Sequence, residues 1–221
     1  MDFEDMEKKI MENHIHAAIF CSPHNPTGRV WEQWEIEKAM KIYKKHDVYV
    51  VSDEIWSDLL LNGHKHTPTQ SVSEDAKQRT VALYAPSNLR DRIRREATMT
   101  HYNHMNVLSM HALIGAYKQE GYEWVDELKE VLSGNVNYAC DYIEKHFEGV
   151  NVSKPEGTYM LFLDCTEWCK KHGKTITELQ AAGIEVGVIW QDGVAFHGPC
   201  HIRMNLAFDR LDKYVFNLQE A

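Results

Sequence analysis

The chain has 221 residues, 43% of them apolar, and a formal net charge of −9 at pH 7. This composition is typical of a globular protein with enough apolar side chains to bury a core, and the acidic balance argues against a protein that binds nucleic acid through its phosphates. No apolar run approaches the ~18–20 residues of a membrane-spanning helix, and the acidic amphipathic start is unlike a secretory signal, so we expect a cytoplasmic protein that contacts no membrane.

The first part of the chain predicts a strand–helix–strand unit. A short buried strand at His16–Cys21 precedes a turn, and Trp31–His46 has the apolar spacing of a helix with one buried face. The β-branched and aromatic run Val48–Val51 predicts a parallel strand that is buried on both faces. We expect a third strand at Thr80–Tyr84, after a long polar connection at Asn62–Arg79.

The character of the sequence changes after Asn88. Leu89–Lys118 and Tyr122–Phe147 predict long helical stretches, broken near Gly121 and again near Gly134. Further along the chain we expect a strand at Thr158–Asp164, helices near Thr166–His172 and Ile176–Ala182, strands at Ile184–Ile189 and His201–Leu206, and a last helix from Phe208 to about Leu218. We therefore predict a partial large α/β domain with a connecting helix over residues 1–150 and a small α+β domain over residues 151–221.

Polar residues follow three predicted strands where each strand ends. They lie in His24–Gly28, Asp53–Asp58 and Ala85–Ser87. Ligands of open α/β sheets bind at the carboxyl ends of parallel strands, and Arg203, inside a later predicted strand, has the fork geometry that clamps a carboxylate.

Each of these features also has a simpler interpretation. Asn-Pro-Thr-Gly is a favourable turn sequence, Asp53 and Ser87 are suited to helix caps, and Arg203 could be a surface charge. The five cysteines, an odd and scattered set, indicate free thiols in a reducing compartment. Cys165 with Cys169 supplies too few ligands for a closed zinc site, and the histidine pairs His64 with His66 and His101 with His104 lack a third ligand at convincing spacing, so we expect no metal.

Four segments in one order resemble a known family. They are Cys21–Arg29 (CSPHNPTGR), Ser52–Asp58 (SDEIWSD), Ala85–Ser87 (APS) and Lys154–Tyr159 (KPEGTY). Together they resemble the fold-type I pyridoxal-phosphate enzymes, and within these the cystathionine β-lyase-like branch of the class I/II aminotransferases. The resemblance covers nearly the whole chain, and HNPTG followed at this distance by DEI is specific.

The resemblance implies a three-layer large domain with a mostly parallel sheet, a small C-terminal α+β domain, a homodimer, and pyridoxal 5′-phosphate as cofactor. By this resemblance Asn25 bonds the 3′-oxygen of the cofactor, Asp53 pairs with its ring nitrogen, and Ser87 contacts its phosphate. Trp56 takes the position where many transaminases carry a tyrosine and packs beside the cofactor. Arg203 binds the α-carboxylate of a small amino-acid substrate.

The sequence departs from the family pattern directly after Ser87. The family has a lysine there, which forms a Schiff base with the cofactor and moves the α-proton, whereas this chain continues Asn88-Leu89-Arg90. A smaller skip is expected after Ala207, and the N-terminal portion of the family is absent. Either the polypeptide is a fragment or an internally deleted chain, or it belongs to a longer protein whose residues at these loops this sequence does not contain. An intact mass near 25.7 kDa would favour the first explanation.

Two functions of different classes follow from these observations. The first is a pyridoxal-phosphate-dependent C–S β-lyase or aminotransferase, which works through aldimine and quinonoid forms of the cofactor in the complete protein. The second is a non-catalytic fragment of such an enzyme, which the missing lysine favours.

Overall fold

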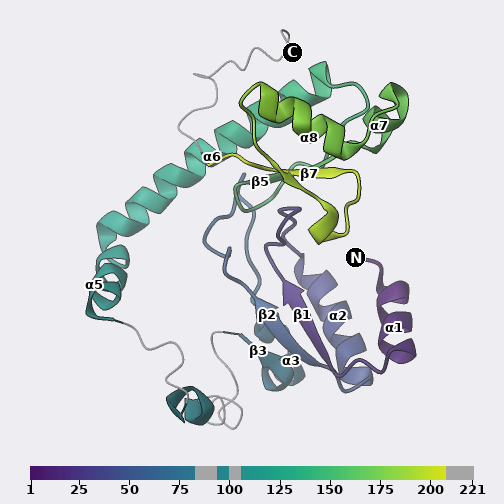
Figure 1. The fold of residues 1–221 in the computed structure, drawn as a ribbon. Coiled ribbons are helices and arrows are strands. Elements are labelled where there is room, and N and C mark those ends of the chain that lie inside the picture. The colour runs from purple at the N-terminus through teal and green to yellow at the C-terminus, as the bar shows by residue number, and fades with distance from the viewer. Residues whose placement is uncertain (83–93, 100–105, 208–221) are drawn as a thin grey trace. The chain divides into compact units, whose positions relative to one another are not determined.

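The computed structural model describes residues 1–82, 94–99 and 106–207. The chain divides into two compact units, each taken by itself below (Figure 1). Unit 1 comprises Met1–Ser22, Val30–Ser57 and Lys65–Trp124, and unit 2 comprises Pro23–Arg29, Asp58–His64 and the chain from Val125 onward. The predicted division into residues 1–150 and 151–221 stays a prediction. The predicted helix at Phe208–Leu218 and Ser87 lie outside the described residues.

Unit 1 contains the predicted strand–helix–strand arrangement. A parallel sheet in the order β1-β2-β3 is formed by β1 (Ala17–Cys21), β2 (Tyr49–Asp53) and β3 (Thr80–Val81). The helix α2 (Gln33–Lys45) connects β1 to β2, as the apolar spacing predicted, and Figure 1 shows it beside these strands. Its apolar face joins a core with alternate strand residues, including Ile36 and Val50, which are fully buried.

Only one face of this sheet is buried, so the prediction of a strand buried on both faces is wrong. Tyr49 and Val51 on β2 are 52% and 47% exposed, and Ile19 on β1 is 78% exposed. Side chains alternate between faces along a strand. Phe20 and Val50 therefore point toward the helices while their neighbours point the other way, where no described residue of unit 1 covers them.

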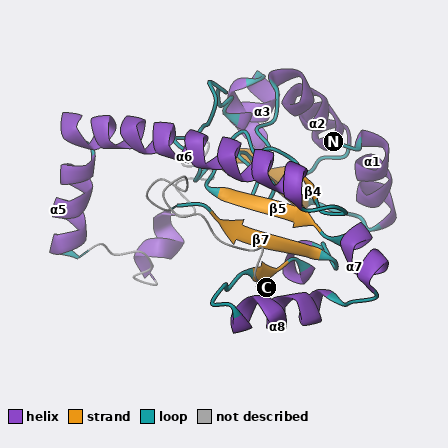
Figure 2. Cartoon of the chain, turned by 90° about the horizontal axis from the view of Figure 1, so that it is seen from above, coloured by secondary structure: helices purple, strands orange, loops and turns teal. Residues whose placement is uncertain are grey.

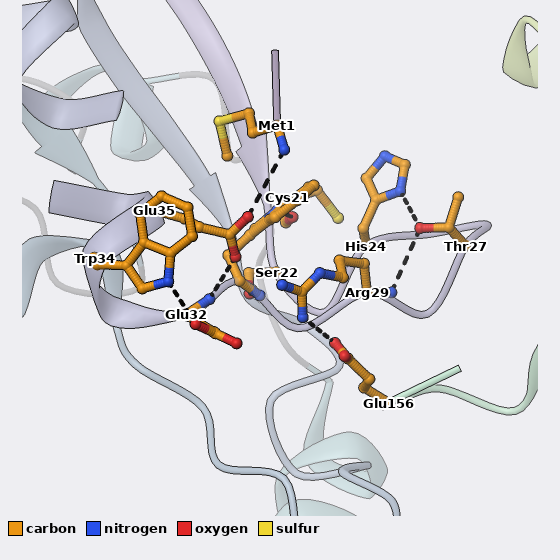
Figure 3. A network of polar contacts seen from close by, with 11 residues as sticks. Met1, Cys21, Ser22, His24, Thr27, Arg29, Glu32, Trp34, Glu35 and Glu156 are labelled. Carbon is orange, nitrogen blue, oxygen red and sulfur yellow. Dashed lines mark hydrogen bonds and ion pairs between the residues drawn. The ribbon is translucent and has the colours of Figure 1, made fainter. Parts of the chain in front are cut away.

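Local sequence explains the helices of unit 1. At the start of α2, Glu35 Oε2 accepts the Glu32 N–H at 2.9 Å in a capping box (Figure 3). The segment predicted as a plain connection contains the 3₁₀ helix η1 (Thr69–Ser71) and α3 (Glu74–Arg79), because Ser73 caps α3 by accepting the Ala76 N–H. The remaining helices are α1 (Phe3–Glu12), which buries Ile10, residues 94–99, and α5 (Val107–Ala116). No residue of α5 is buried.

Unit 2 is built on an antiparallel sheet in the order β4-β5-β7-β6. The strands are β4 (Asn151–Val152), β5 (Met160–Asp164), β7 (His201–Asn205) and β6 (Gln191–Asp192). The helices are α6 (Gln119–His146), which belongs to unit 2 from Val125 onward, α7 (Thr166–His172) and α8 (Ile176–Glu185), and a 3₁₀ helix η2 spans Val194–Phe196. Figure 2 shows α6 running over β4 and β5, with α8 on the other side of the sheet.

Two predictions for unit 2 are wrong. The predicted break near Gly121 is confirmed within a few residues, since α5 ends at Ala116 and α6 begins at Gln119, but the predicted break near Gly134 does not occur. The helix α6 continues through Gly134 because an interior glycine costs only about 1 kcal/mol and the helix packs through buried residues such as Leu132 and Val136. The apolar run Ile184–Ile189 is not a strand. A capping box at Thr175 starts α8, which includes Ile184 and ends before a turn.

Among the helices of the described residues, none combines the length and the apolar content that crossing a bilayer requires.

Candidate functional site

Asp53 ends β2 at the edge of the unit 1 sheet where β1 also ends. It pairs in register with Cys21, and its carbonyl accepts the Ser22 N–H at 3.0 Å. The residue is exposed, and its Oδ1 accepts the Ile55 N–H at 3.3 Å. Half-buried Trp56 follows in the turn after the strand. The expected strand-end location of Asp53 is therefore confirmed.

A buried polar cluster lies next to Asp53 in unit 1. The Glu54 carboxylate accepts the Thr69 N–H at 3.0 Å and lies 2.9 Å from the Ser52 hydroxyl, and His66 Nε2 lies 3.3 Å from Glu54 Oε2. Burial by itself would raise the pKa of Glu54. The close contact with His66 and the hydrogen bonds from Thr69 and Ser52 outweigh burial, and the pKa of the carboxyl lies below its usual value. Glu54 is therefore ionised at neutral pH although it lies in a shielded place.

The loop that contains Asn25 belongs to unit 2 and is closed by its own hydrogen bonds. The His24 N–H donates to Arg29 O at 2.8 Å, and His24 Nδ1 lies 2.8 Å from the Thr27 hydroxyl (Figure 3). Burial lowers the pKa of His24. Arg29 Nη1 donates to Glu156 Oε2 at 2.5 Å, which ties the loop to the turn before β5. The turn sequence thus folds as the simpler interpretation predicted, and it also positions Asn25.

Arg203 contacts Asn25 across 178 positions of sequence. It lies in β7, opposite Phe162 of β5 and Gln191 of β6, and its Nη1 donates to Asn25 Oδ1 at 3.0 Å. Its Nη2 donates to Gln191, and its guanidinium lies 4.6 Å from the centre of the Phe196 ring. Arg203 is part-buried and held in place, so it is not the plain surface charge of the simpler interpretation.

Gly28 allows this loop to approach the turn before β5. Its φ is +68°, and its carbonyl accepts the N–H groups of both Glu156 and Gly157 at 3.0 Å. A Cβ at this position would lie 2.3 Å from the Pro155 Cβ. Only glycine fits here without a shift of the neighbouring backbone.

The structure therefore brings together two of the predicted site residues, Asn25 and Arg203. Asp53 and Trp56 belong to unit 1, and Ser87 lies outside the described residues. Sequence reasoning missed the role of His66 as the partner of Glu54, because it considered this histidine only as a metal ligand. An acid directly after a strand-end aspartate, followed by a histidine in the next polar loop, is the signal that could have suggested the pair.

The thiols and histidines show no metal centre in the described part of the chain, where no three potential ligands come together. None of the five cysteines, all of which lie in the described residues, forms a disulfide, and Cys165 and Cys169 are buried in the core of unit 2. Burial raises the pKa of Cys165 to about 12, so this thiol stays protonated and packs as a small apolar group. His101 and His104 lie outside the described residues.

Comparison with known proteins assigns the chain to a family. The profile of the aminotransferase class I and II family matches residues 1–211. Cystathionine beta-lyase PatB of Bacillus subtilis is 32% identical over 217 residues, which are 90% of this chain and 55% of that protein.

Two solved structures share the fold. Cystalysin from Treponema denticola, whose crystal structure contains a pyridoxal 5′-phosphate cofactor, superimposes with a TM-score of 0.85 at 26% identity, over 95% of this chain and 57% of its own. The C-S lyase from Staphylococcus hominis, solved with its cofactor bound, gives a TM-score of 0.81 at 28% identity, over 94% and 56%. The chain thus spans little more than half the length of these three proteins, and it belongs to the class I and II aminotransferase family.

Proposed function

We propose that this chain is part of a pyridoxal-phosphate-dependent enzyme that acts on small, sulfur-containing amino acids, as a C–S β-lyase or an aminotransferase. The similarity to the cystathionine beta-lyase PatB and to the C-S lyase of Staphylococcus hominis supports the lyase, and membership of the class I and II aminotransferase family supports aminotransfer. When bound, pyridoxal phosphate supplies the electron sink that makes the α-proton of an amino acid acidic.

The residues of the chain fit this cofactor. Asn25 uses its Oδ1 to accept from Arg203, so its amide nitrogen faces elsewhere as a donor suited to the 3′-oxygen. The exposed Asp53 carboxylate is suited to holding a proton at the ring nitrogen. Trp56 is proposed to pack beside the ring, and Ser87 is proposed to bind the phosphate.

The contact between Arg203 and Asn25 is the observation that carries the proposal. One residue is assigned to the substrate carboxylate and the other to the cofactor, and the structure places them 3.0 Å apart. With Asn25 and Gln191 each accepting one hydrogen bond, the guanidinium is fixed in orientation while further N–H groups remain for a bidentate carboxylate contact. Phe196 supports its face, so the substrate carboxylate is bound at a defined place.

The complete protein should be tested with L-cystathionine. Elimination releases ammonia, pyruvate and a thiol, whereas aminotransfer to an added keto acid gives a keto acid that retains the sulfur. We expect pyruvate and thiol in equal amounts. If a complete, cofactor-loaded protein forms neither set of products, the proposed function is contradicted. If it forms only a sulfur-containing keto acid, the enzyme is an aminotransferase.

Replacing Arg203 with lysine should weaken substrate binding because an ammonium cannot form the two parallel hydrogen bonds of a guanidinium. One charged hydrogen bond contributes about 1.5–3 kcal/mol, so we expect kcat/KM to fall by about 10–100-fold, chiefly through a higher KM. The control is Arg79→Lys, which makes the same change in an ion pair with Asp75 and should lower stability with KM unchanged. An unchanged KM for Arg203→Lys would remove Arg203 from the substrate site.

A second candidate is a fragment or internally deleted chain that performs no turnover. The observation in its favour is the sequence Ser87-Asn88, where the family resemblance places the lysine. The 221-residue chain, assayed alone beside the complete protein, is expected to form no pyruvate and to give no adduct that borohydride fixes. We also propose that the complete protein is a cytoplasmic homodimer, with a large domain over residues 1–150 and a small one over 151–221.

A further inference from the structure

The turn that carries Asp53 is held weakly by its own hydrogen bonds. The Asp53 side chain accepts one N–H, that of Ile55, at the long distance of 3.3 Å. One further bond within the turn joins the Ser57 N–H to the Glu54 carbonyl at 3.0 Å. The carbonyl of Asp53 accepts the Ser22 N–H, and this contact fixes the backbone before the turn.

The two neighbours of Asp53 make the stronger contacts. Ser52 is buried, and its hydroxyl lies 2.9 Å from Glu54 Oε1 and 2.8 Å from the Thr69 hydroxyl. The Thr69 N–H donates to the same Glu54 oxygen at 3.0 Å. The segment around η1, more than ten positions further along the chain, therefore binds Glu54, the residue that directly follows Asp53.

His66 also contacts Glu54. Its side chain is 10% exposed and that of Glu54 is 14% exposed, with His66 Nε2 and Glu54 Oε2 at 3.3 Å. Neither ring nitrogen of His66 has a partner at hydrogen-bond geometry among the described residues, so Nε2 contacts the Glu54 carboxylate as a close polar neighbour. Glu54 is thus the polar group that orients the imidazole, and a buried pair of this kind is costly to break because removing one partner leaves the other shielded and alone.

We propose that Glu54 and His66 are positioning residues, which together lock the turn after β2 so that the Asp53 carboxylate stays at the carboxyl end of the sheet. This inference rests on the proposed cofactor role of Asp53. Ser52 is buried on the covered face of the sheet and bonds Glu54, whereas Asp53 is exposed on the other face. Glu54 and His66 can therefore hold the turn without occupying the proposed cofactor site.

Amide hydrogen exchange at Ile55 and Ser57 tests the lock without any cofactor. We expect His66→Leu and Glu54→Gln each to speed exchange at these two amides about tenfold, and His66→Gln, which keeps a donor for Glu54, to restore most of the protection. The control is His64→Asn, because His64 is exposed in the same polar segment and should leave exchange unchanged. Exchange at the amides of α2 reports global stability. The acceleration at Ile55 and Ser57 must therefore exceed any acceleration at the amides of α2.

Titration with pyridoxal phosphate then tests the link to Asp53. In the complete protein with Asp53 present, we expect His66→Leu to weaken cofactor affinity about five- to tenfold. In a protein that already carries Asp53→Ala, we expect no further effect of His66→Leu, because holding the turn in place does not matter once the carboxylate is gone.

The outcomes separate the two proposals. A protein that does not bind the cofactor contradicts the proposed function, whereas the exchange result still decides about the lock. Exchange at Ile55 and Ser57 in His66→Leu equal to that in His64→Asn overturns the inference. So does an equal loss of cofactor affinity with and without Asp53, because the pair would then act on the whole unit. If Glu54→Gln is too unstable to measure, the comparison of His66→Leu with His66→Gln gives the same decision.

Discussion

Replacing Asp53 with alanine should lower turnover of the complete protein by about two to three orders of magnitude while leaving it folded. The proposed contact is a carboxylate beside a protonated ring nitrogen, and removing a preorganised charged partner of a reacting group costs about 100–1,000-fold in kcat. The fold should tolerate the change because the Asp53 side chain is exposed and accepts only one long hydrogen bond within the described residues, from Ile55. Turnover and the denaturant midpoint, measured on the same preparation, check both parts.

The matched control is Asp164→Ala. Asp164 also ends a strand, and its Oδ1 accepts the N–H of the residue two positions on, Thr166, at 2.9 Å. The substitution removes the same local contact at a place to which no role in the reaction is assigned, and it should cost about 1 kcal/mol of stability with turnover unchanged. Near-normal turnover for Asp53→Ala would show that the cofactor does not lie at the end of β2.

Much of the fold follows from patterns that act within a few residues. The helix α2 has its apolar residues at helical spacing and a capping box at its start, and β1 and β2 are short apolar runs bounded by turns. Such elements are specified by local sequence, and their bounds agree with the prediction within a few residues.

The errors arise where local patterns do not report what lies on the other side of an element. Val48–Val51 reads as a strand buried on both faces, yet Val51 is 47% exposed. The chain covers 57% of the cystalysin structure, and the rest of that fold has no counterpart in this chain. Ile184–Ile189 has the composition of a strand, but the helix started by Thr175 extends into it. Composition could not decide between these two outcomes.

The candidate site, like the fold, could be predicted from the sequence only in part. Asp53 could be placed from sequence, since the end of a strand is a local feature. The contact between Arg203 and Asn25 could not be derived from spacing, because it joins residues 178 positions apart, and only the family resemblance suggested that both serve one site. The pairing of His66 with Glu54 was missed for the same reason, since a loop histidine gives no sign of its partner.

Replacing Gly28 with alanine should destabilise unit 2 by about 3 kcal/mol or more, a large share of the ~5–15 kcal/mol that holds a typical domain folded. Two costs add. A non-glycine residue at φ +68° costs about 1–2 kcal/mol, and forcing a methyl group into a packed contact costs about 1–3 kcal/mol. The new Cβ would lie 2.3 Å from the Pro155 Cβ and 2.7 Å from the Gly157 carbonyl oxygen. Pro155 is fully buried, so it has little room to move away.

Gly63→Ala isolates the steric part of this effect. Gly63 also belongs to unit 2 and has a φ of +79°, but a Cβ there would meet no atom within 4 Å. It should cost only the backbone part, about 1–2 kcal/mol, and the difference between the two variants measures the clash with the turn before β5. Denaturant unfolding gives both values. Gly28 lies three residues after Asn25, so a loop shift that relieves the clash should also break the contact between Asn25 and Arg203. Gly28→Ala should therefore raise KM for the amino acid, whereas Gly63→Ala should leave KM unchanged. Equal stabilities for the two variants would mean that the loop and the turn do not pack as closely as the structure shows.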